Sequence, residues 1–578
     1  MNIDRLRFNF SKFHPIERQS ANWIIGSRIK RKLYFASLFQ SLLAVLDVLF
    51  LALIASFVAS LSGGGVLPSA GKTLLASFSS QDIFALIFVV VLIKNMASIL
   101  TQRYVAYLLA NREAAVSAGM LQAYLLRQMD NSEDAHSSEL IGIFTVFLTN
   151  IFSNLFKPIV TLVAETATVI SVLFGLLYIS PIVAVCTVFY FLIIALLYVG
   201  LLGKYQRKIG AIAASTSKTS LRTFTEIVRS QKEIRFSHTE DDYLANVYER
   251  KKKLTRMQAS QSLNQAMPRY FLEICLISGL SGLIFLWPHD RSSTLFSVLG
   301  LLVAAGYRIL PSINNQLIII NGFRQTLAPL RIIFEAGSSF GATERSIELR
   351  LPTREGPRIK FNGDLEFRDV CFSYPKGNEI FSNLSFKLRM GESLLLQGPS
   401  GSGKTTFIGL ASGLLRPTLG KVLIVDSKSA SENELTSTVS GIGYLGSDVA
   451  LFDDDFLFNI CLSRDDVVDF DRLKNIVDAV GLTARVNDNR LGLNAQIGEN
   501  GQFLSKGERQ RIGLARILYA QNPFIILDEP TSNLDSATAE LVWLVLQELR
   551  GKSTMIIVSH GFVPPFLYDF KKNLGTSL

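Results

Sequence analysis

The chain has 578 residues, of which 49% are hydrophobic and 18% are charged, and its mean hydropathy is +0.31. This apolar content excludes a disordered or collagen-like chain and disfavours a purely soluble protein. The formal net charge is +10, and many basic residues gather in 1–32 and 204–256, beside apolar segments. That placement follows the positive-inside rule of membrane proteins, so no nucleic acid partner is expected.

Six long apolar runs occupy the first 335 residues, and each has close to or more than the ~20 residues that a membrane-spanning helix needs. Most of the basic residues in this part lie in the N-terminus and in segments 104–150 and 203–265. The positive-inside rule therefore predicts a multi-pass protein of the inner (cytoplasmic) membrane, surrounded by membrane lipid, with both termini in the cytoplasm. The predicted spans are near residues 34–61, 83–110, 155–179, 181–204, 268–287 and 294–320.

The basic segments between the spans have helical periodicity and few glycines or prolines. We expect Asn111–Gln128 and Tyr205–Met257 to continue the spans as helices beyond the bilayer. The expected turns at their far ends are Arg127–Ser138 and Thr216–Phe224. Residues 336–362 are predicted to be a linker, because they are polar and contain two prolines.

The first chemical motif is the segment Gly398–Thr405, with the sequence GPSGSGKT. It follows an apolar strand-like run and precedes a helical run, which is the context of a phosphate-binding loop. Glycines allow backbone N–H groups to surround phosphates, Lys404 adds a positive charge, and the Thr405 hydroxyl can bind Mg²⁺. The predicted ATP ligands here are Gly398, Pro399, Ser400, Gly401, Ser402, Gly403, Lys404, Thr405 and Thr406.

A second motif is the acidic pair Asp528-Glu529, which ends the apolar run Pro523–Leu527. Asp528 is placed to hold Mg²⁺, and Glu529 is placed to polarise the water that attacks the terminal phosphate. An acidic pair at the end of a strand is weak evidence by itself. Its value comes from its combination with the phosphate-binding loop.

The segment Leu504–Arg511 reads LSKGERQR. With the two motifs above, it resembles the ATP-binding cassette (ABC) transporters, whose signature is LSGGQ, and the resemblance covers nearly the whole chain. The order of its parts resembles an exporter half-transporter. This implies a membrane all-α domain with six long transmembrane helices in 1–335, followed by an ATP-hydrolysing α/β P-loop domain with a helical subdomain in 363–578.

The resemblance also implies roles for single residues. Tyr374 matches the aromatic residue that stacks on adenine, although packing of a strand-end tyrosine on the sheet is an alternative. His560 matches the histidine that contacts the γ-phosphate and completes the catalytic pair with Glu529. Three further residues match positions at the dimer interface, where each ATP lies between one phosphate loop and the partner's signature: Ser505, Gly507 and Asp535.

Glu499 matches an exporter loop that couples the cassette to the membrane helices, although a solvated loop acid is an alternative. The working unit implied by the resemblance is a dimer of half-transporters, with a homodimer preferred to a heterodimer. The expected cofactors are ATP and Mg²⁺.

Three short segments, 137–140, 231–235 and 307–314, resemble bacterial lipid-linked oligosaccharide flippases. They imply an amphipathic or lipid-linked glycan substrate that is moved to the outer leaflet. Charges inside spans often face a cavity, so Arg308, Arg103 and Lys94 are candidates for binding its pyrophosphate. The alternative is that these cations form salt bridges with Asp47, Glu165 or Glu273, or extend towards the interface.

Some positions depart from the family pattern. Ser447 stands where the family has a glutamine that reaches Mg²⁺ and the attacking water, and the signature has Lys506 and Glu508 where Gly and Gln are usual. Only 18 residues follow His560. Slow hydrolysis is therefore expected. Two alternative functions stay open: a peptide, lipid or drug exporter that acts as half of a heterodimer, and a non-pumping ATP-gated regulatory subunit.

Overall fold

The computed structural model divides near residue 350 into two compact units. It describes residues 15–47, 49–50, 53, 80–126, 137–179, 181, 185, 223–224, 226–228, 230–286, 292–340, 360–374, 379–426, 431–435, 439–464, 468–487, 492–532 and 534–574. Most of the predicted span 181–204 and most of the two predicted turns lie outside these residues.

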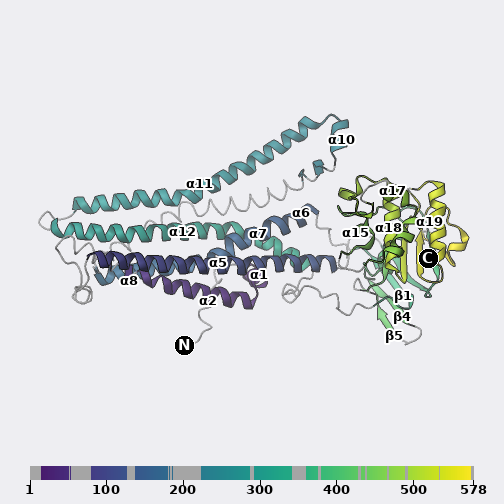
Figure 1. Ribbon diagram of the computed structural model, residues 1–578, viewed down its shortest axis with the longest axis horizontal. Helices are drawn as coiled ribbons and strands as arrows, with labels where there is room; N and C mark the ends of the chain where they lie inside the picture. Colours follow the sequence, from purple (N-terminus) through teal and green to yellow (C-terminus); the bar gives the residue numbers. More distant parts are fainter. Residues whose placement is uncertain are drawn as a thin grey trace. The chain divides into compact units, whose positions relative to one another are not determined.

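The first unit is helical, and its long helices lie alongside one another (Figure 1). Two short π-helical stretches, η3 (Ile143–Phe147) and η4 (Phe152–Phe156), join three helical pieces into one nearly continuous rod. The described α-helices are α1 (Pro15–Ile25), α2 (Ser27–Leu43), α5 (Ser80–Leu126), α6 (Ser137–Gly142), α7 (Leu148–Ile151), α8 (Lys157–Ile179), α10 (Gln231–Phe236), α11 (Glu240–Leu286) and α12 (Ser292–Ser339).

Two stretches of the described residues are long and apolar enough to cross a membrane, namely Gln81–Leu125 and Leu140–Tyr178. Helix α5 has 47 residues, which corresponds to about 70 Å, well beyond the ~30 Å of a hydrocarbon core. Its C-terminal part confirms the prediction that Asn111 onward continues the span as a helix, through Leu126. Many side chains on its surface are exposed and apolar, which suits contact with lipid, among them Phe84, Phe88, Leu92, Ile93, Met96, Ile99 and Leu100.

The core of this unit lies where α1, α5, the α6–α8 rod and α12 meet. The ring of Trp23 packs edge-on against Phe334, with 6.0 Å between ring centroids. Its indole also lies 2.3 Å from the place where a Cβ on Gly337 would stand, so any larger residue there would displace it. The buried Arg112 donates a hydrogen bond from Nε to the Ile24 carbonyl, at 2.9 Å, and ties α5 to α1.

Two boundaries differ from the predictions. The expected helix Tyr205–Met257 is interrupted at 237–239, between α10 and α11, where His238 has a φ of 52°. A left-handed residue ends the helical hydrogen-bond ladder, and no glycine or proline marks this position. Helix α12 runs on to Ser339 and therefore enters the predicted linker.

The second unit is an α/β domain with two sheets. A parallel sheet has the strand order β6-β7-β8-β3-β9, and an antiparallel sheet has the order β2-β1-β4-β5. The strands are β1 (Asp364–Ser373), β2 (Glu379–Leu388), β3 (Ser393–Gln397), β4 (Leu419–Asp426), β5 (Ser431–Glu434), β6 (Ile442–Leu445), β7 (Phe524–Asp528), β8 (Thr554–Val558) and β9 (Phe570–Asn573).

Helix α14 (Lys404–Ala411) lies between the two sheets. The ring of its Phe407 stacks on Phe367 of β1, with 5.1 Å between centroids, and both side chains are fully buried. Strands β3, β7 and β8 have apolar central residues and are buried over almost their whole length, as expected for strands covered on both faces. The phosphate-binding loop that precedes α14 is thereby fixed at one end to this aromatic core.

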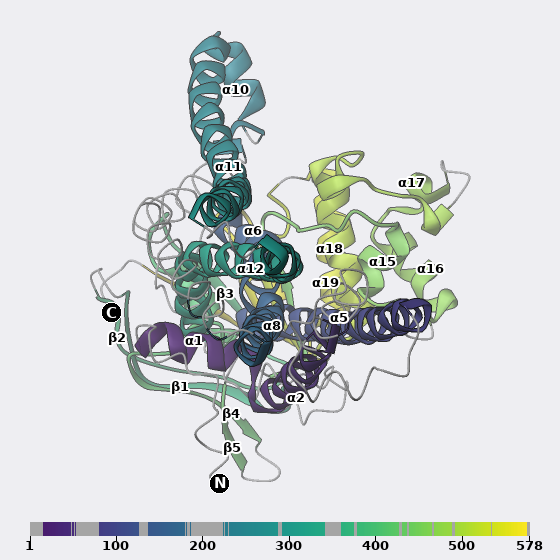
Figure 2. The same ribbon diagram turned by 90° about the vertical axis from the view of Figure 1, so that its left-hand side faces the viewer.

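A group of helices packs against the parallel sheet of this domain and forms the predicted helical subdomain. Its members share a second apolar core with β7 and β8. Figure 2 shows these helices on one side of the domain and the antiparallel strands on the other. They are α15 (Phe456–Cys461), α16 (Phe470–Ala479), α17 (Thr483–Asn487), α18 (Lys506–Ala520) and α19 (Ser536–Leu549).

Candidate functional site

The phosphate-binding loop connects β3 to α14, as predicted. Gly401 and Gly403 have φ angles of 80° and 92°, which side chains with a Cβ rarely adopt. At Gly403 a Cβ would also lie 2.8 Å from the Ile380 side chain. The backbone therefore curls at these two glycines and leaves the first N–H groups of α14 without intrahelical acceptors, which suits an anion.

Lys404 lies within this loop. Its ammonium donates hydrogen bonds to the carbonyl oxygens of Gly398 and Pro399, at 2.7 and 2.8 Å. Since the lysine is held by carbonyl groups, its charge has no carboxylate partner in the loop and is available to a phosphate. On the other side of the loop, the carbonyl of Leu574 would be 2.4 Å from a Cβ on Gly398, so this glycine is required for the close approach of the chain after β9.

The catalytic candidates meet at the carboxyl ends of β7 and β8, two neighbouring parallel strands. Glu529 directly follows β7 and His560 follows β8, and 3.6 Å separates Glu529 Oε1 from His560 Nε2. Burial and the nearby Glu529 carboxylate raise the pKa of Asp528 above its usual value, and Lys404 and His560 oppose this shift. Lys404, Asp528, Glu529 and His560 are therefore close enough to affect one another electrostatically.

Glu529 has a strained backbone. Its φ is 53°, which is uncommon for a residue that is not glycine. The conformation is held by a hydrogen bond from its N–H to the Val558 carbonyl, at 2.9 Å, and by one from Gln510 Nε2 to its own carbonyl oxygen, at 2.9 Å. Gln510 is almost completely buried, and no local sequence pattern marks it as a support for the catalytic residue.

The residues present fit the expected Mg²⁺. Hard cations of this kind prefer oxygen ligands and usually keep several waters. The exposed hydroxyl-bearing Thr405 at the start of α14 and the partly buried Asp528 supply such oxygens. A carboxylate whose pKa is raised by burial also gains from a cation beside it.

The signature segment forms the start of α18. Ser505 caps this helix, because its Oγ accepts from the Glu508 N–H, and the Glu508 carboxylate accepts from the Ser505 N–H at 2.7 Å. Glu508 also lies 3.4 Å from Arg485. The departure from the usual Gln at 508 therefore completes a capping box. Ser505 and Lys506 are exposed at a helix N-terminus, which suits contact with an anion.

Tyr374 lies at the end of β1. Its hydroxyl is 2.9 Å from the Thr406 hydroxyl, and its ring packs edge-on against Phe372, with centroids 5.0 Å apart. The side chain therefore borders the phosphate-binding loop. It also packs on the sheet, which is the alternative role predicted from the sequence. Its contact with adenine stays a prediction.

Ser447, which stands where the family has a glutamine, lies in the loop after β6. Tyr444, in β6, has its hydroxyl oxygen 3.1 Å from the place where a Cβ on Gly446 would stand. Burial and the charge of Asp528 raise the pKa of the Tyr444 phenol. The tyrosine therefore lies over the loop that precedes Ser447. It is close enough to Asp528, the proposed Mg²⁺ ligand, to be affected by its charge.

Two further candidates lie in loops. Asp535 caps α19, since its carboxylate accepts from the Thr538 N–H and hydroxyl, both at 2.9 Å. The Thr538 N–H keeps the pKa of Asp535 below its usual range. Glu499 is exposed beside Asn500, whose φ is 52°. Their interface and coupling roles stay predictions.

Comparison with known proteins agrees with this geometry. The family model described as "ABC transporter" matches residues 381–532, which contain the phosphate loop, the signature and the acidic pair. These residues form an ABC transporter domain. The chain also resembles the solved "Structure of a bacterial Atm1-family ABC exporter with ATP bound", with a TM-score of 0.70, 16% identity, and coverage of 93% of this chain and 92% of the other. The whole chain therefore has the fold of an ABC exporter.

Curated proteins with sequence similarity to this chain include flippases. An "ATP-dependent lipid A-core flippase" of Ralstonia nicotianae is 31% identical over 53% of this chain and 50% of the relative. A protein with the same name from Burkholderia pseudomallei is 27% identical over 73% of this chain and 70% of the relative. The chain thus spans about half the length of the first of these relatives.

The three candidates for substrate binding lie in the helical unit. Lys94 and Arg308 both form ion pairs with Asp47, with 2.6 Å from the Arg308 guanidinium to the carboxylate. Lys94 and Arg308 therefore form the salt bridges that the alternative predicted, and the cluster keeps one excess positive charge. Arg103 is exposed and lies over the ring of Tyr107, 5.7 Å from its centroid.

The two other acids have different partners. The Glu165 carboxylate accepts hydrogen bonds from Ser312 and Asn315, at 2.6 and 2.9 Å, and so joins α8 to α12 through neutral donors. Glu273 pairs with Arg269 on the exposed surface of the same helix, at 3.0 Å.

Proposed function

We propose that this protein hydrolyses ATP to move an amphipathic glycolipid across the inner membrane, as one half of a homodimer with both termini in the cytoplasm. The observation that carries the proposal is the convergence of Lys404, Asp528, Glu529 and His560 at the ends of β3, β7 and β8, which are adjacent in one sheet. The ABC transporter family match over the same residues supports it.

The chemistry follows from these positions. Glu529 accepts a proton from the water that attacks the γ-phosphate, and Lys404 and the loop N–H groups stabilise the charge on the phosphate oxygens. His560, 3.6 Å from Glu529, orients that carboxylate and reaches the same phosphate. Thr405 and Asp528 would hold Mg²⁺, which when bound would supply further neutralisation of charge.

The exposed start of α18 supports the proposed dimer. Ser505 and Gly507 contact the ATP of the partner subunit, and Lys506 adds a positive charge at that helix N-terminus. Asp535 lies near the interface, and Glu499 couples the cassette to the membrane helices. Because a second copy of this chain supplies all these groups, a homodimer is sufficient to complete both ATP sites.

The substrate class is an anionic glycolipid. The relatives named lipid A-core flippase support a glycolipid, and the excess positive charge of the Asp47, Lys94 and Arg308 cluster suits an anionic headgroup. Within this class, the segments 137–140, 231–235 and 307–314 favour a polyprenyl-pyrophosphate-linked oligosaccharide.

The test is ATP hydrolysis by the full chain in liposomes, with Glu529→Gln as the inactive control. We expect stimulation by a polyprenyl-pyrophosphate glycan that is reduced in Arg308→Gln. Stimulation by lipid A-core alone would move the substrate to that glycolipid, and no hydrolysis would refute the homodimer. A rate that is indifferent to both lipids would refute the substrate class.

A further inference from the structure

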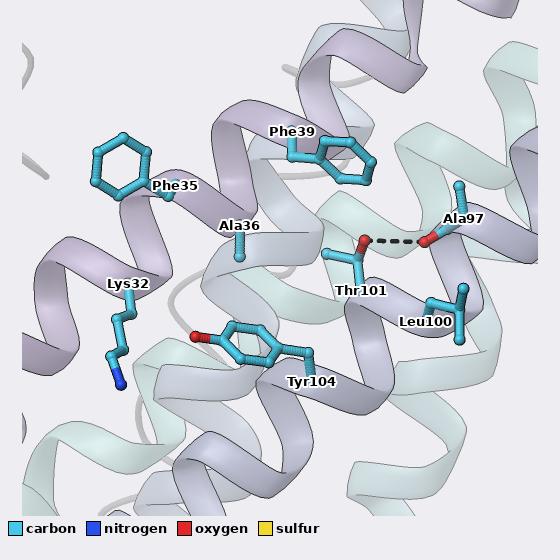
Figure 3. A pocket seen from close by; sticks show the side chains of 8 residues that line it. All are labelled: Lys32, Phe35, Ala36, Phe39, Ala97, Leu100, Thr101 and Tyr104. Atoms are coloured by element: carbon cyan, nitrogen blue, oxygen red, sulfur yellow. Dashed lines mark hydrogen bonds between the residues drawn. The ribbon is translucent and has the colours of Figure 1, made fainter.

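A groove between α2 and α5 has no role in the proposal above. Its volume is about 470 Å³, and it is lined by Lys32, Phe35, Ala36, Phe39, Ala97, Leu100, Thr101 and Tyr104. In Figure 3 the Lys32 ammonium and the Tyr104 hydroxyl lie at one end, whereas Phe39, Ala97 and Leu100 line the other. The groove is therefore amphipathic along its length.

The walls of the groove are held in place by polar contacts between its two helices. Gln40 Nε2 donates to Ser98 Oγ at 2.9 Å, just beyond the apolar end, and Lys94 of α5 forms an ion pair with Asp47, a few residues after the end of α2. The Thr101 hydroxyl is bonded to the Ala97 carbonyl of its own helix, so it presents its methyl group rather than a free donor. The apolar end thus offers little to a polar ligand.

The apolar walls are open to the surroundings. Phe35 is 65% exposed, Leu100 is 59% exposed and Phe39 is 47% exposed. In a soluble protein such a face would be unfavourable, but a lipid chain lowers its free energy by covering it. A volume of this size is also in the range of sites that bind small molecules.

The charge at the other end selects the headgroup. Helix α2 contains Arg28, Lys30, Arg31 and Lys32 and no acidic residue. No acidic side chain of the described residues lies within ion-pair distance of Lys32, so its charge is uncompensated. A phosphate is the complementary group, and the nearby Tyr104 hydroxyl can donate a second hydrogen bond to it.

The sequence places this end at the cytoplasmic surface. The basic N-terminus and the helical extension of α5 beyond Tyr104 are both predicted to be cytoplasmic, and tyrosine is enriched at membrane interfaces. From Ile83 to Tyr104 a helix rises by about 32 Å, which is close to the thickness of the hydrocarbon core. The apolar end of the groove then points into the bilayer.

We propose that this groove binds one acyl chain of an anionic phospholipid of the cytoplasmic leaflet, with its phosphate on Lys32 and Tyr104. The inference rests on the membrane location in the proposed function, although the site is separate from the ATP site and from the transported glycolipid.

Native mass spectrometry of the full-length protein, with phosphatidylglycerol or phosphatidylcholine added, tests the proposal. We expect retention of phosphatidylglycerol in preference to phosphatidylcholine. Lys32→Ala should weaken phosphatidylglycerol binding by about fivefold, the effect of one lysine near a membrane surface. The matched control is Arg31→Ala, which removes a neighbouring exposed charge outside the groove and should change binding by less than about twofold.

A second variant tests the apolar end. Ala97→Phe fills the groove and should reduce retention of both lipids, whereas Met96→Phe, on the adjacent exposed position, should not. If the phenyl ring of Ala97→Phe lowers the midpoint temperature of thermal unfolding, Ala97→Leu replaces it as the smaller substitution. Equal losses in Lys32→Ala and Arg31→Ala, equal binding of both lipids, or no effect at Ala97 would overturn the proposal.

ATP hydrolysis by the same samples separates the two proposals. Active protein without phosphatidylglycerol preference would refute the groove alone, whereas specific lipid retention without hydrolysis would refute the proposed function alone. Displacement of phosphatidylglycerol by the glycolipid substrate would make the groove part of the transport path and would contradict the phospholipid assignment.

Discussion

Gln510 donates a hydrogen bond from its side-chain amide to the backbone carbonyl of Glu529, at 2.9 Å. The first residue lies in the signature helix α18 and the second at the end of β7. The contact fixes a left-handed peptide (φ 53°) that aims the proposed general base. The signature helix therefore supports the catalytic residue of its own subunit through its buried side.

Gln510→Leu removes this contact and should lower the kcat of ATP hydrolysis by about tenfold, the equivalent of one hydrogen bond of ~1.4 kcal/mol. ATP binding should change much less, because Gln510 touches no residue of the phosphate loop in the described contacts. Steady-state kinetics and nucleotide binding measure the two effects. Gln547→Leu, on an exposed face of α19, is the control, and an equal loss of binding and turnover in Gln510→Leu would contradict a positioning role.

Glu529→Gln should reduce hydrolysis by at least about 100-fold while ATP binding is kept, because the amide cannot accept the proton from water. The amide has almost the same shape, so His560 and the backbone contacts keep their positions. Phosphate release and nucleotide retention measure the outcome, and Glu540→Gln is an exposed control. Normal hydrolysis in Glu529→Gln would remove this residue from the role of base.

Ser447→Gln should raise kcat by about tenfold, since the longer side chain adds one hydrogen bond to the attacking water. Serine at this position is too short for that contact. The same change in a Glu529→Gln background should have no effect on turnover, which provides the control. An unchanged rate in the single variant would indicate that another group already holds the water.

Asp528→Asn tests the effect of burial on this carboxyl. Because the folded protein raises its pKa, the folded state binds the proton more tightly than the unfolded chain. The ionised carboxylate therefore costs stability at neutral pH, and this cost disappears as the pH falls to the ordinary aspartate range near ~3.9. Without nucleotide, the variant should unfold at a higher temperature than the parent at pH 7 and lose that advantage near pH 4. A constant difference across this range would contradict the pKa shift.

Asp47→Asn should destabilise the helical unit by roughly 2 kcal/mol, since it leaves Lys94 and Arg308 without their shared counter-ion. The effect is smaller than for a fully buried pair because the Arg308 side chain is 31% exposed. Thermal unfolding in detergent measures it. Glu273→Gln, which breaks an exposed pair with Arg269, should cost under ~0.5 kcal/mol, and Asp47→Asn with Lys94→Met should restore part of the loss.

The two-part architecture and the nucleotide site could be predicted from the amino-acid sequence alone. A phosphate loop needs a glycine-rich segment between a strand and a helix, and that requirement is local, so Gly398–Thr405 and its context could be identified from the chain alone. The long apolar runs and the helical continuation of α5 were likewise readable from composition and periodicity.

Contacts between segments that are far apart in the sequence became known only from the folded chain. The pairing of Asp47 with Lys94 and Arg308 joins residues up to 261 positions apart, and the sequence left it open against a role in substrate binding. Gln510 gave no local signal, since its partner is a backbone carbonyl rather than a recognisable side chain. The break at His238 was missed because a left-handed φ at a histidine depends on the surrounding packing rather than on intrinsic preference. Long-range packing fixes each of these features, and a one-dimensional pattern carries no record of it.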